Sequence, residues 1–582
     1  MPLVNITIDG IRMQVPQDST ILEAARKANI KIPTLCHLEL HNRETVNRVA
    51  SCRICVVEIP GRRNLAPACA TKVAPNMEIR TCTPRVLTAR RTNMQLLLSN
   101  HPKDCLNCYA SGNCELQDLA NQMHTDTNRY EGTSSEFAIE TSNQSIVRDL
   151  NKCIRCRRCE TACNEMQTVG VLSGVGRGFD MVVGPALHKP LAETQCVFCG
   201  QCVKVCPTGA LMGKSHIEEV WKAIADPEKV VIVQTAPAVR AALGEEFGLE
   251  PGHSVTKKMV TALRRLGFDH VFDTNFGADL TIVEEATEFI HRLQHGGRLP
   301  MLTSCCPAWV KFFEHQFQDL LDVPSSCKSP QQMFGAIAKT YWAQKMQIDP
   351  AKIVVVSVMP CLSKKYEASR GELSASGHQD VDFVLSTREM GRMLKEAGLD
   401  FLSLPDGEFD HPLGYSTGGA DIFAVSGGVL EAALRMAAEV ITGQELENVD
   451  FEEVRGLRGL RHAHVEIAGK TVNVAIACGL GNARKLLEEV RAGKSEYHLI
   501  EIMACPGGCI GGGGQPFVDS KKEPEVIAKR AAAIYAEDAG KEIRSSHKNP
   551  YIQELYQEFL GEAYGEKAHQ LLHTHYTGRE KL

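Results

Sequence analysis

The beginning of the chain alternates apolar and polar positions, as β-strands with one buried face do. Residues 1–16 keep this alternation throughout, and residues 19–30 follow with the apolar spacing of a helix. Ser19 or Thr20 caps this helix, and Pro33 lies beyond its end. The pattern predicts a small domain of short strands with one helix in residues 1–80.

A different alternation begins near residue 215, where strand-like apolar runs and helical patterns follow one another. They lie at residues 229–239, 254–267, 270–274, 278–294 and 352–361. This alternation is typical of an α/β region, here of roughly 300 residues, which suffices for one or two doubly wound lobes. The end of the chain shows helical patterns followed by a polar tail.

Composition and charge narrow the classes of partner. The 582 residues are 43% hydrophobic, and 64 basic against 70 acidic residues leave a net charge of -6. This balance offers no basic face for nucleic acid or an anionic membrane. No segment reaches the roughly 18 apolar residues of a membrane span, and the N-terminus shows no export signal. We therefore expect a cytoplasmic protein without nucleic acid or membrane as partner.

The chain has 23 cysteines in short spacings, which in a reducing cytosol indicate metal sites rather than disulfides. The first set is Cys36, Cys52, Cys55 and Cys69, with one close pair between two outer residues. A zinc site is the alternative, although four-cysteine zinc sites usually use two close pairs. Around ASCRICVVEI the segment resembles the [2Fe-2S] ferredoxin domain, which implies a β-grasp fold and one [2Fe-2S] cluster on these thiols.

A second set contains Cys105, Cys108 and Cys114, three thiols that leave a four-iron cluster one ligand short. His101 is close enough in sequence to supply the fourth, although a lone histidine is more often a surface or capping residue. The stretch HPKDCLNCYASGNCELQDLA resembles a [4Fe-4S] module found in the large iron-sulfur subunit of complex I and in multi-cluster hydrogenases. The resemblance implies that His101 is a ligand.

Two further runs, CIRCRRCETAC and CVFCGQCVKVCP, repeat the spacing of bacterial two-cluster ferredoxins. In that pattern the fourth cysteine of each run binds the cluster of the other run, which ties the two halves into one domain. The predicted ligand sets are Cys153, Cys156, Cys159 and Cys206 for one [4Fe-4S] cluster, and Cys196, Cys199, Cys202 and Cys163 for the other.

The remaining cysteine motifs follow strand-like runs, where α/β folds place their sites. They are TSCCPAW with Cys305 and Cys306, MPCLSKKYE with Cys361, and EIMACPGGCIGGGGQP with Cys505 and Cys509. None has the two-residue ferredoxin spacing, so we expect one cluster assembled from distant segments. In order and nearly residue for residue, these segments resemble the signature motifs of [FeFe]-hydrogenases, and the resemblance covers essentially the whole chain.

This resemblance implies an H-cluster, which is a [4Fe-4S] cube bridged through cysteine to a two-iron site carrying CO, cyanide and a dithiolate. By the resemblance, Cys306, Cys361, Cys505 and Cys509 bind the cube, and Cys509 also bridges to the two-iron site. Lys364 is then the donor to a cyanide. The residues that match the rest of the pocket are Glu367, which orients the loop, and Ala236, Pro237, Gln331, Met359, Phe423 and Met503.

Cys305 remains outside the cube, and a thiol beside a metal site relays protons when its pKa is suitably tuned. The resemblance implies this relay role. Glu285, Glu288 and Arg292 share one face of the predicted helix at residues 278–294, and Ser325 matches the hydroxyl step of the family between the two glutamates. Without the motifs, a solvated salt-bridged face is the ordinary interpretation of such a pattern.

Glycines dominate the sequence around Cys505 and Cys509. We expect Gly507 and Gly508 to permit a tight turn between the two thiols. We expect residues 511–514, all glycine, to let the backbone pass against a metal site too bulky for any Cβ. Three cysteines match no cluster motif and are interpreted as structural thiols: Cys82, Cys327 and Cys478.

The predicted fold class is an α+β multidomain chain that ends in a large two-lobed α/β catalytic domain. The expected domains are the [2Fe-2S] ferredoxin domain in residues 1–80, the histidine-and-three-cysteine module in 81–140, the two-cluster ferredoxin domain in 141–214, the H-cluster domain in 215–520 and a helical small-subunit-like segment in 521–582.

The resemblance implies reversible oxidation of H2 to two protons and two electrons, with one [2Fe-2S] and three accessory [4Fe-4S] clusters for the electrons. No Gly-x-Gly-x-x-Gly follows a strand, so nicotinamide and flavin sites are expected in other chains. The expected partners are flavin- and NAD(P)-binding subunits and a small [2Fe-2S] subunit, with electron bifurcation to ferredoxin as an extension. The alternatives are a monomeric ferredoxin-dependent hydrogenase, a complex-I-like electron-transfer subunit and an H2 sensor.

Overall fold

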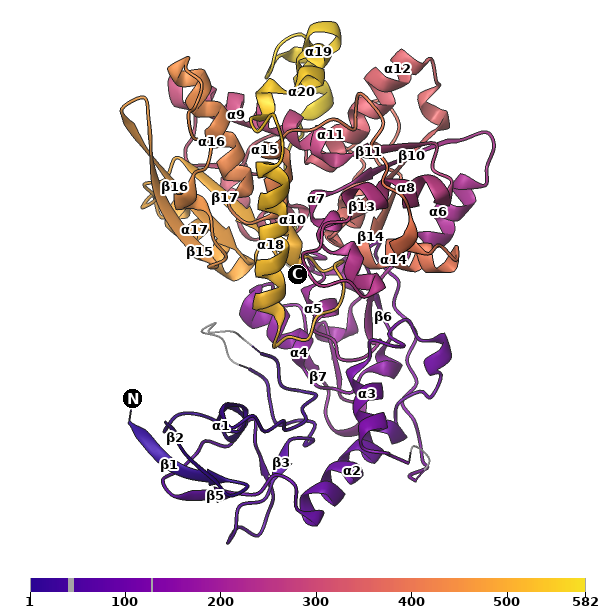
Figure 1. The fold of residues 1–582 in the computed structure, drawn as a ribbon, viewed down its shortest axis with the longest axis vertical. Helices are drawn as coiled ribbons and strands as arrows, with labels where there is room; N and C mark the ends of the chain where they lie inside the picture. The colour runs from indigo at the N-terminus through magenta and orange to yellow at the C-terminus, as the bar shows by residue number, and fades with distance from the viewer. Residues whose placement is uncertain (1, 40–46, 127–128, 581–582) are drawn as a thin grey trace.

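The computed structural model describes residues 2–39, 47–126 and 129–580. In Figure 1 the chain runs from a small N-terminal sheet at the bottom, through a middle part of short elements, to a large α/β body at the top. The clustered cysteine runs lie in the lower and middle parts, and the three distant motifs lie in the body. This layout is the predicted α+β multidomain class.

The N-terminal sheet has the order β2-β1-β5. β1 (Leu3–Ile8) pairs antiparallel with β2 (Ile11–Pro16) and parallel with β5 (Met77–Ile79). The inward residues of β1 share a core with α1 (Ile21–Lys27), whose first turn is closed by a capping box at Thr20. The predicted strands and helix are confirmed here. Two short strands complete this part, β3 (Val56–Val57) and β4 (Ala66–Pro67).

The middle part has little regular structure, because much of its chain forms loops around cysteines. β6 (Ile146–Arg148) pairs antiparallel with β9 (Leu211–Gly213), so the two ends of the repeated cysteine segment lie side by side. β7 pairs antiparallel with β8 inside that segment. The remaining bounds are α2 (Pro84–Ser99), α3 (Glu115–Gln122), α4 (Arg158–Glu160), β7 (Ser173–Val175), β8 (Val182–Gly184) and α5 (Gln201–Lys204).

The α/β body contains two four-stranded sheets, as a two-lobed domain requires. The first has the order β11-β10-β13-β14 and is parallel throughout. The second has the order β12-β17-β16-β15, and only β15 is antiparallel to its neighbour. The strands are β10 (Val230–Thr235), β11 (His270–Asp273), β12 (Met301–Leu302), β13 (Ile353–Met359), β14 (Phe383–Ser386), β15 (Leu460–Ile467), β16 (Lys470–Cys478) and β17 (Leu499–Met503).

Helices cover both sheets, and α9 lies between the lobes. α9 (Thr274–His295) contacts β10 of the first sheet, α11, and α16, which packs on the second sheet. Its N-terminal two thirds are buried, so polar residues there face protein rather than water. The other helices are α6 (Ile217–Ile224), α7 (Pro237–Arg240), α8 (Thr256–Leu266), α10 (Pro307–Gln316), α11 (Pro330–Ile337), α12 (Ala343–Met346), α13 (Ser363–Ala368), α14 (Thr387–Glu396), α15 (Gly418–Asp421), α16 (Gly428–Thr442) and α17 (Leu480–Arg491).

The C-terminal segment lies against the body instead of extending from it. α18 (Glu523–Ala539) runs between the two lobes in Figure 1 and is followed by α19 (Pro550–Leu555) and α20 (Glu566–Leu572). The expected helices are therefore present. The polar tail after α20 returns to the body, where His573 forms a backbone bridge with Cys327.

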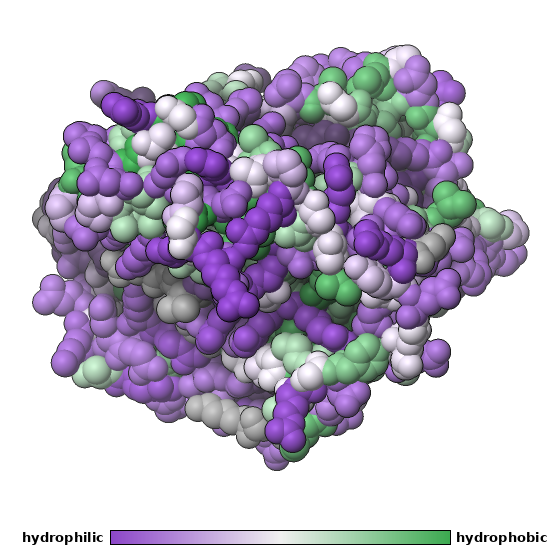
Figure 2. Space-filling model, turned by 90° about the horizontal axis from the view of Figure 1, so that it is seen from below, coloured by the Kyte–Doolittle hydropathy of each residue, from purple (hydrophilic) through white to green (hydrophobic). Residues whose placement is uncertain are grey.

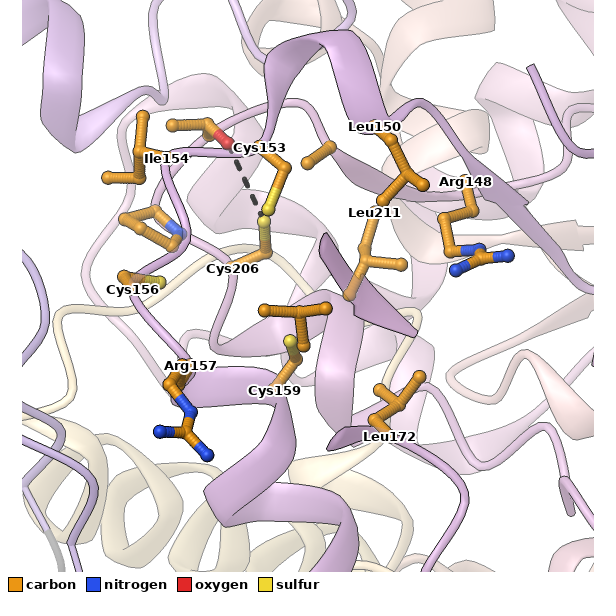
Figure 3. Close-up of a pocket in the computed structure, with 14 residues that line it drawn as sticks. Arg148, Leu150, Cys153, Ile154, Cys156, Arg157, Cys159, Leu172, Cys206 and Leu211 are labelled. Atoms are coloured by element: carbon orange, nitrogen blue, oxygen red, sulfur yellow. Dashed lines mark hydrogen bonds between the residues drawn. The ribbon is translucent and has the colours of Figure 1, made fainter. Parts of the chain in front are cut away.

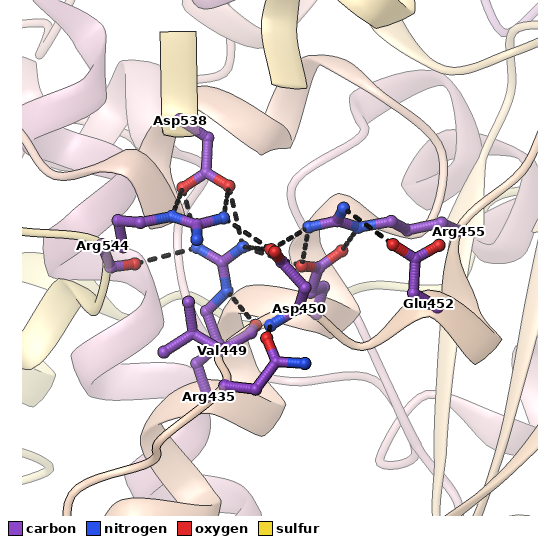
Figure 4. Close-up of polar contacts among 9 residues, drawn as sticks. Arg435, Val449, Asp450, Glu452, Arg455, Asp538 and Arg544 are labelled. Atoms are coloured by element: carbon purple, nitrogen blue, oxygen red, sulfur yellow. Dashed lines mark hydrogen bonds and ion pairs between the residues drawn. The ribbon is translucent and has the colours of Figure 1, made fainter. Parts of the chain in front are cut away.

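A buried ion network holds this segment in place (Figure 4). The Arg435 guanidinium on α16 is fully buried and donates to both Asp538 carboxylate oxygens, each at 2.9 Å. Arg544 donates to the same carboxylate at 2.6 Å and also contacts Asp450. Since Asp538 belongs to α18, the network joins the C-terminal segment to the lobe that carries α16.

Replacing Asp538 with alanine should therefore loosen α18. The change removes the carboxylate that Arg435 and Arg544 share and leaves Glu431, 2.7 Å from Arg435, to balance the buried guanidinium, which costs about 1.5–3 kcal/mol of stability. Hydrogen exchange of residues 523–539 measures the loss of protection. Asp450→Asn is the control, because the Asp450 side chain is 31% exposed and its loss should change exchange much less. Equal effects of the two changes would contradict a stabilising role of the network.

Figure 2 shows the molecule from below, with hydrophilic residues over most of the face and hydrophobic side chains scattered between them. The exposed hydrophobic residues include Leu87, Leu96 and Leu106, of which Leu106 is 99% exposed. These three come from the cysteine-rich N-terminal half. No helix in the described part of the chain has both the length and the apolar character needed to cross a membrane.

Candidate active site

Three cysteine motifs meet where strands of the two sheets end. Cys306 follows β12, Cys361 follows β13, and Cys505 and Cys509 follow β17. Burial raises the pKa of each thiol, to about 12 for Cys361, and nearby thiols of the same set raise the pKa values of Cys361, Cys505 and Cys509 further. Four converging thiols supply the sulfur ligands of one four-iron cluster, and binding of the cluster must release their protons. The residues present therefore fit an iron-sulfur cube.

The structure gives a different reason from the predicted one for the glycines after Cys509. Gly507 and Gly508 do have positive φ, 75° and 97°, as a tight turn requires. However, a Cβ on Gly511 would lie 2.0 Å from the Pro506 carbonyl oxygen, and one on Gly512 would lie 2.2 Å from the Pro360 carbonyl oxygen. We predicted that residues 511–514 are glycine because a metal site leaves no room for a Cβ. At Gly511 and Gly512 this reason is wrong, because the atoms that an added Cβ would meet belong to the protein backbone.

Cys478 holds the turn between Cys505 and Cys509 by two hydrogen bonds. Its Sγ accepts from the Gly507 backbone N–H at 2.9 Å and donates to the Cys505 carbonyl oxygen at 2.8 Å. The thiol is buried, and burial raises its pKa. It therefore has the structural role that was predicted for it, at a position directly behind the backbone of Cys505.

The predicted proton-carrying residues form a buried string along α9. The Ser325 hydroxyl donates to Glu288 Oε2 at 2.8 Å, and Arg292 donates to Glu288 Oε1 at 2.5 Å. The Ser304 backbone N–H donates to Glu285 Oε1 at 3.3 Å, whereas Glu285 Oε2 is buried without a hydrogen-bond partner among the described residues. Glu285 and Glu288 are each 1% exposed, so the alternative of a solvated salt-bridged face is wrong.

Burial and neighbouring charges keep two groups of this string protonated. Burial, followed by the Glu288 carboxylate, raises the pKa of Glu285 to about 8. Burial, followed by Glu285, raises the pKa of the Cys305 thiol well above its usual range. Both groups are therefore neutral donors near neutral pH, and each responds to the charge of the other.

A polar cluster lies beside Cys305. The Lys364 ammonium donates to the Cys305 carbonyl oxygen at 3.1 Å and to Glu367 Oε2 at 3.0 Å. Gln331 donates to the same Glu367 oxygen at 3.0 Å, and its own Oε1 is buried without a partner among the described residues. The other predicted pocket residues are buried at element ends: Met359 at the end of β13, Met503 at the end of β17, Phe423 after α15, and Ala236 and Pro237 at the start of α7.

The repeated cysteine runs enclose two separate cavities. Cys153, Cys156, Cys159 and Cys206 line one, which Figure 3 shows with Leu150, Leu172 and Leu211 around the sulfurs. The other is lined by Cys163, Cys196, Cys199 and Cys202. Each run thus contributes its fourth cysteine to the cavity of the other run, which is the arrangement that the exchanged ligand sets require.

The two N-terminal cysteine sets differ in how closely they are assembled. Cys52 and Cys36 have their sulfurs 3.4 Å apart, and those of Cys55 and Cys69 are 3.3 Å apart, with all four residues buried. In the second set, Cys114 is buried, Cys108 is partly buried and Cys105 is exposed. His101 Nδ1 is buried without a partner among the described residues, and burial lowers the pKa of its imidazole, so the ring has the neutral form that binds metals.

Comparison with known families accounts for all of these segments. A family model described as iron only hydrogenase large subunit, C-terminal domain, matches residues 229–513. Residues 524–579 match the iron hydrogenase small subunit. The other matches are a 2Fe-2S iron-sulfur cluster binding domain at residues 2–84, the NADH-ubiquinone oxidoreductase-G iron-sulfur binding region at 90–129 and a 4Fe-4S dicluster domain at 152–210.

Individual relatives extend over the whole chain. The NADP-reducing hydrogenase subunit HndD of Solidesulfovibrio fructosivorans is 58% identical over 100% of both chains. The chain belongs to the [FeFe]-hydrogenase family. Iron hydrogenase 1 of Clostridium pasteurianum is 40% identical over 98% of this chain and 99% of its own. A solved [FeFe]-hydrogenase from Chlamydomonas reinhardtii is 42% identical, with a TM-score of 0.57 over 63% of this chain and 100% of that chain.

Membership in this family makes the protein an H2-active oxidoreductase, an iron hydrogenase with 2Fe-2S and 4Fe-4S binding domains and an H-cluster domain. It replaces the zinc interpretation of the first cysteine set, because that segment matches a 2Fe-2S domain. It also rules out a complex-I-like subunit without an H-cluster domain.

The cysteine sets of the hydrogenase form a continuous row. One hydrophobic cluster contains Cys36 and Cys52 of the first set, Cys114 of the second and Cys156 of the third. At the other end, a Cβ on Gly513 would lie 2.7 Å from the Cys199 carbonyl oxygen, so the loop after Cys509 touches the last accessory set. Protein packing alone thus connects the N-terminal sheet to the active site.

The titration of Glu285 is expected to control proton supply in the hydrogenase. As pH rises through about 8, the carboxyl group loses its proton, so the C=O stretch of a buried carboxylic acid should disappear and H2 evolution should slow. Infrared difference spectra between about pH 6 and about pH 10 measure the midpoint, and Glu285→Gln should remove the band. A Glu285 band that is already lost at about pH 5 would contradict the raised pKa.

Sequence reasoning missed how the C-terminal tail reaches this string. His573 is 8% exposed and lies beside Ser326 and Glu284, and the Tyr576 hydroxyl donates to the Ser325 carbonyl oxygen at 2.5 Å. The signal in the sequence was the group of histidines in LLHTHY. It follows the last family motif by about sixty residues, so no local spacing connected it to the site.

Proposed function

We propose that this hydrogenase oxidises H2 reversibly as the H2-activating subunit of a multisubunit enzyme that exchanges electrons with NAD(P). The main observation that supports this proposal is the continuous row of cysteine sets, which extends beyond the catalytic domain to a 2Fe-2S domain. The similarity to an NADP-reducing hydrogenase subunit over the full length supports this proposal. The structural relative from Chlamydomonas reinhardtii covers only 63% of the chain.

The proposed ligands follow the cysteine geometry described above. We assign one [2Fe-2S] cluster, three accessory [4Fe-4S] clusters and the H-cluster. The sets are Cys36, Cys52, Cys55 and Cys69; His101, Cys105, Cys108 and Cys114; Cys153, Cys156, Cys159 and Cys206; Cys163, Cys196, Cys199 and Cys202; and Cys306, Cys361, Cys505 and Cys509 for the cube. When bound, the H-cluster supplies the iron chemistry that forms and cleaves H2.

The residues of the chain itself move the protons. Cys305 exchanges a proton with Glu285, and Ser325 connects Glu285 with Glu288 because its hydroxyl hydrogen-bonds the Glu288 carboxylate. Arg292 holds Glu288 at the outer end of the string. Lys364, held by Glu367, places a positive charge beside Cys305, where an anionic ligand would be stabilised. Protons and electrons thus leave by different routes.

The proposed partners are a flavoprotein that binds NAD(P) and a small [2Fe-2S] subunit, with ferredoxin as a second electron partner in a bifurcating enzyme. The match of residues 90–129 to a region of NADH-ubiquinone oxidoreductase supports a route to nicotinamide. The exposed leucines near the N-terminal cysteine sets, Leu87, Leu96 and Leu106, offer apolar area for such a contact.

A monomeric, ferredoxin-dependent hydrogenase is the second candidate. It is favoured by the match to Iron hydrogenase 1, which is 40% identical over 98% of this chain and 99% of that relative. Purification of the native protein under gentle conditions, followed by H2-dependent reduction of NAD and NADP, separates the two. We expect a flavin-containing protein to co-purify and NAD(P) to be reduced. A chain that runs alone and reduces ferredoxin but neither nicotinamide would contradict the multisubunit proposal.

A further inference from the structure

Three buried side chains beside the proton string come from distant parts of the chain. They are Glu288 of α9, Cys327 before α11, and His573 after α20. One ligand atom from each lies within 4.8 Å of the other two, and Cys327 Sγ is 4.0 Å from Glu288 Oε2. Thiolate, imidazole and carboxylate are the donors that Zn²⁺ takes in proteins.

Backbone pairing brings Cys327 and His573 together. The two residues form an antiparallel bridge, flanked by hydrogen bonds from Lys328 N–H to the Leu572 carbonyl and from Thr574 N–H to the Ser326 carbonyl, both 2.8 Å. Directly opposite residues of an antiparallel pair have their Cβ atoms about 4.5–5.5 Å apart on the same face. The fold therefore sets the thiol and the imidazole side by side, with Glu288 of α9 next to them.

A carboxylate orients the His573 ring through one ring nitrogen, as is usual for metal-binding histidines. Its Nε2 lies 3.0 Å from Glu284 Oε2, and Glu284 is held by the Tyr564 backbone N–H at 2.9 Å and by the Tyr556 hydroxyl. With Nε2 as donor to this carboxylate, Nδ1 keeps its lone pair on the side of Ser326, whose hydroxyl is 2.8 Å away. A carboxylate behind a ligating histidine is the common outer partner in zinc sites.

We propose that Cys327, His573 and Glu288 form a binding site for a zinc-type divalent cation, with the Ser326 hydroxyl or a water as fourth ligand. With metal-ligand bonds of about 2.0–2.3 Å, tetrahedral ligand atoms lie roughly 3.3–3.7 Å apart. The thiol and the carboxylate, now 4.0 Å apart, need to approach by only a few tenths of an ångström. Ser326 is partly exposed and provides the way in from solvent.

Occupation of this site has a functional consequence, which rests on the proposed proton route. Glu288 accepts a hydrogen bond from the Ser325 hydroxyl and is the carboxylate that follows Glu285 in the string. Bound to a cation, it no longer accepts a proton, so zinc should block H2 turnover from the proton side without touching an iron site.

The experiment titrates ZnCl2 into the fully matured full-length hydrogenase. Zinc per chain, zinc X-ray absorption and H2 turnover are measured for the unchanged chain, Cys327→Ala and His573→Ala, each relative to its own zinc-free turnover. The controls are Cys82→Ala, which removes an exposed cysteine, and His575→Ala, which removes an exposed histidine two residues after His573. Infrared and electron paramagnetic resonance spectra check that the iron sites stay intact.

We expect one zinc per chain with one sulfur and one imidazole ligand, and inhibition that needs at least about tenfold more zinc in Cys327→Ala and His573→Ala but not in the controls. Absence of such a zinc, or equal sensitivity of Cys327→Ala and Cys82→Ala, would overturn the site and leave the proton route as it stands. Zinc bound by this ligand set without inhibition would support the site and overturn the passage of protons through Glu288.

Discussion

Replacing Cys305 with alanine is expected to lower H2 turnover by at least about 100-fold in both directions, while the iron content stays near that of the unchanged chain. The thiol lies outside the four proposed cube ligands, and its pKa responds to burial and to Glu285. Loss of one positioned proton carrier typically costs about 10²–10⁴-fold in rate. Turnover with an artificial electron donor, together with iron analysis, measures both quantities.

Cys82→Ala is the matched control, because Cys82 is exposed and belongs to no proposed cluster. Its turnover and iron content should equal those of the unchanged protein. Undiminished turnover of Cys305→Ala would refute the relay role of Cys305. Loss of iron in parallel with activity would instead identify Cys305 as a residue needed for cluster assembly.

Gly508→Ala is expected to prevent assembly of the cube and to lower turnover by at least about tenfold. At φ 97°, an L-residue is strained by about 1–2 kcal/mol. The added Cβ would also lie 2.6 Å from the Ser426 backbone nitrogen, which cannot withdraw freely because it donates to the Gly507 carbonyl at 3.1 Å. The turn between Cys505 and Cys509 must therefore open, which separates two proposed ligands of one cluster. Iron content and thermal unfolding of the matured protein measure the damage.

Gly493→Ala separates backbone strain from crowding. Gly493 also has positive φ, 65°, but an added Cβ meets nothing within 4 Å. This change should cost about 1–2 kcal/mol of stability and leave the iron content unchanged. Equal loss of iron in both variants would contradict the role of close backbone packing at Gly508.

The sequence predicted those parts of the site whose signal is local. The spacing of Cys153 to Cys163 and of Cys196 to Cys206 follows from the short loops that bind a cluster, and the structure places these residues around two cavities. Glu285 and Glu288 share a helix face because three residues make almost one turn. Apolar runs likewise predicted the strands β10, β11 and β13, since buried parallel strands are continuously hydrophobic.

The features that escaped prediction depend on contacts between distant residues. His573 lies 289 positions from its partner Glu284, and no periodic pattern links two such positions. Cys327 was predicted to be a structural thiol, and no spacing in the sequence indicated that it lies beside Glu288 and His573. The reason for the glycines after Cys509 was also misjudged, because only the fold shows that Pro360 and Cys199 approach them.

The central claim is that this chain holds an H-cluster at Cys306, Cys361, Cys505 and Cys509 and uses it to turn over H2. Infrared spectroscopy of the matured protein tests it most directly, because among the proposed cofactors only the two-iron site has CO and cyanide bound to iron. We predict these bands in the unchanged protein and their absence in a chain whose Cys509 is replaced with alanine. Absence of these bands from protein produced in cells that mature other hydrogenases to full activity would contradict the claim.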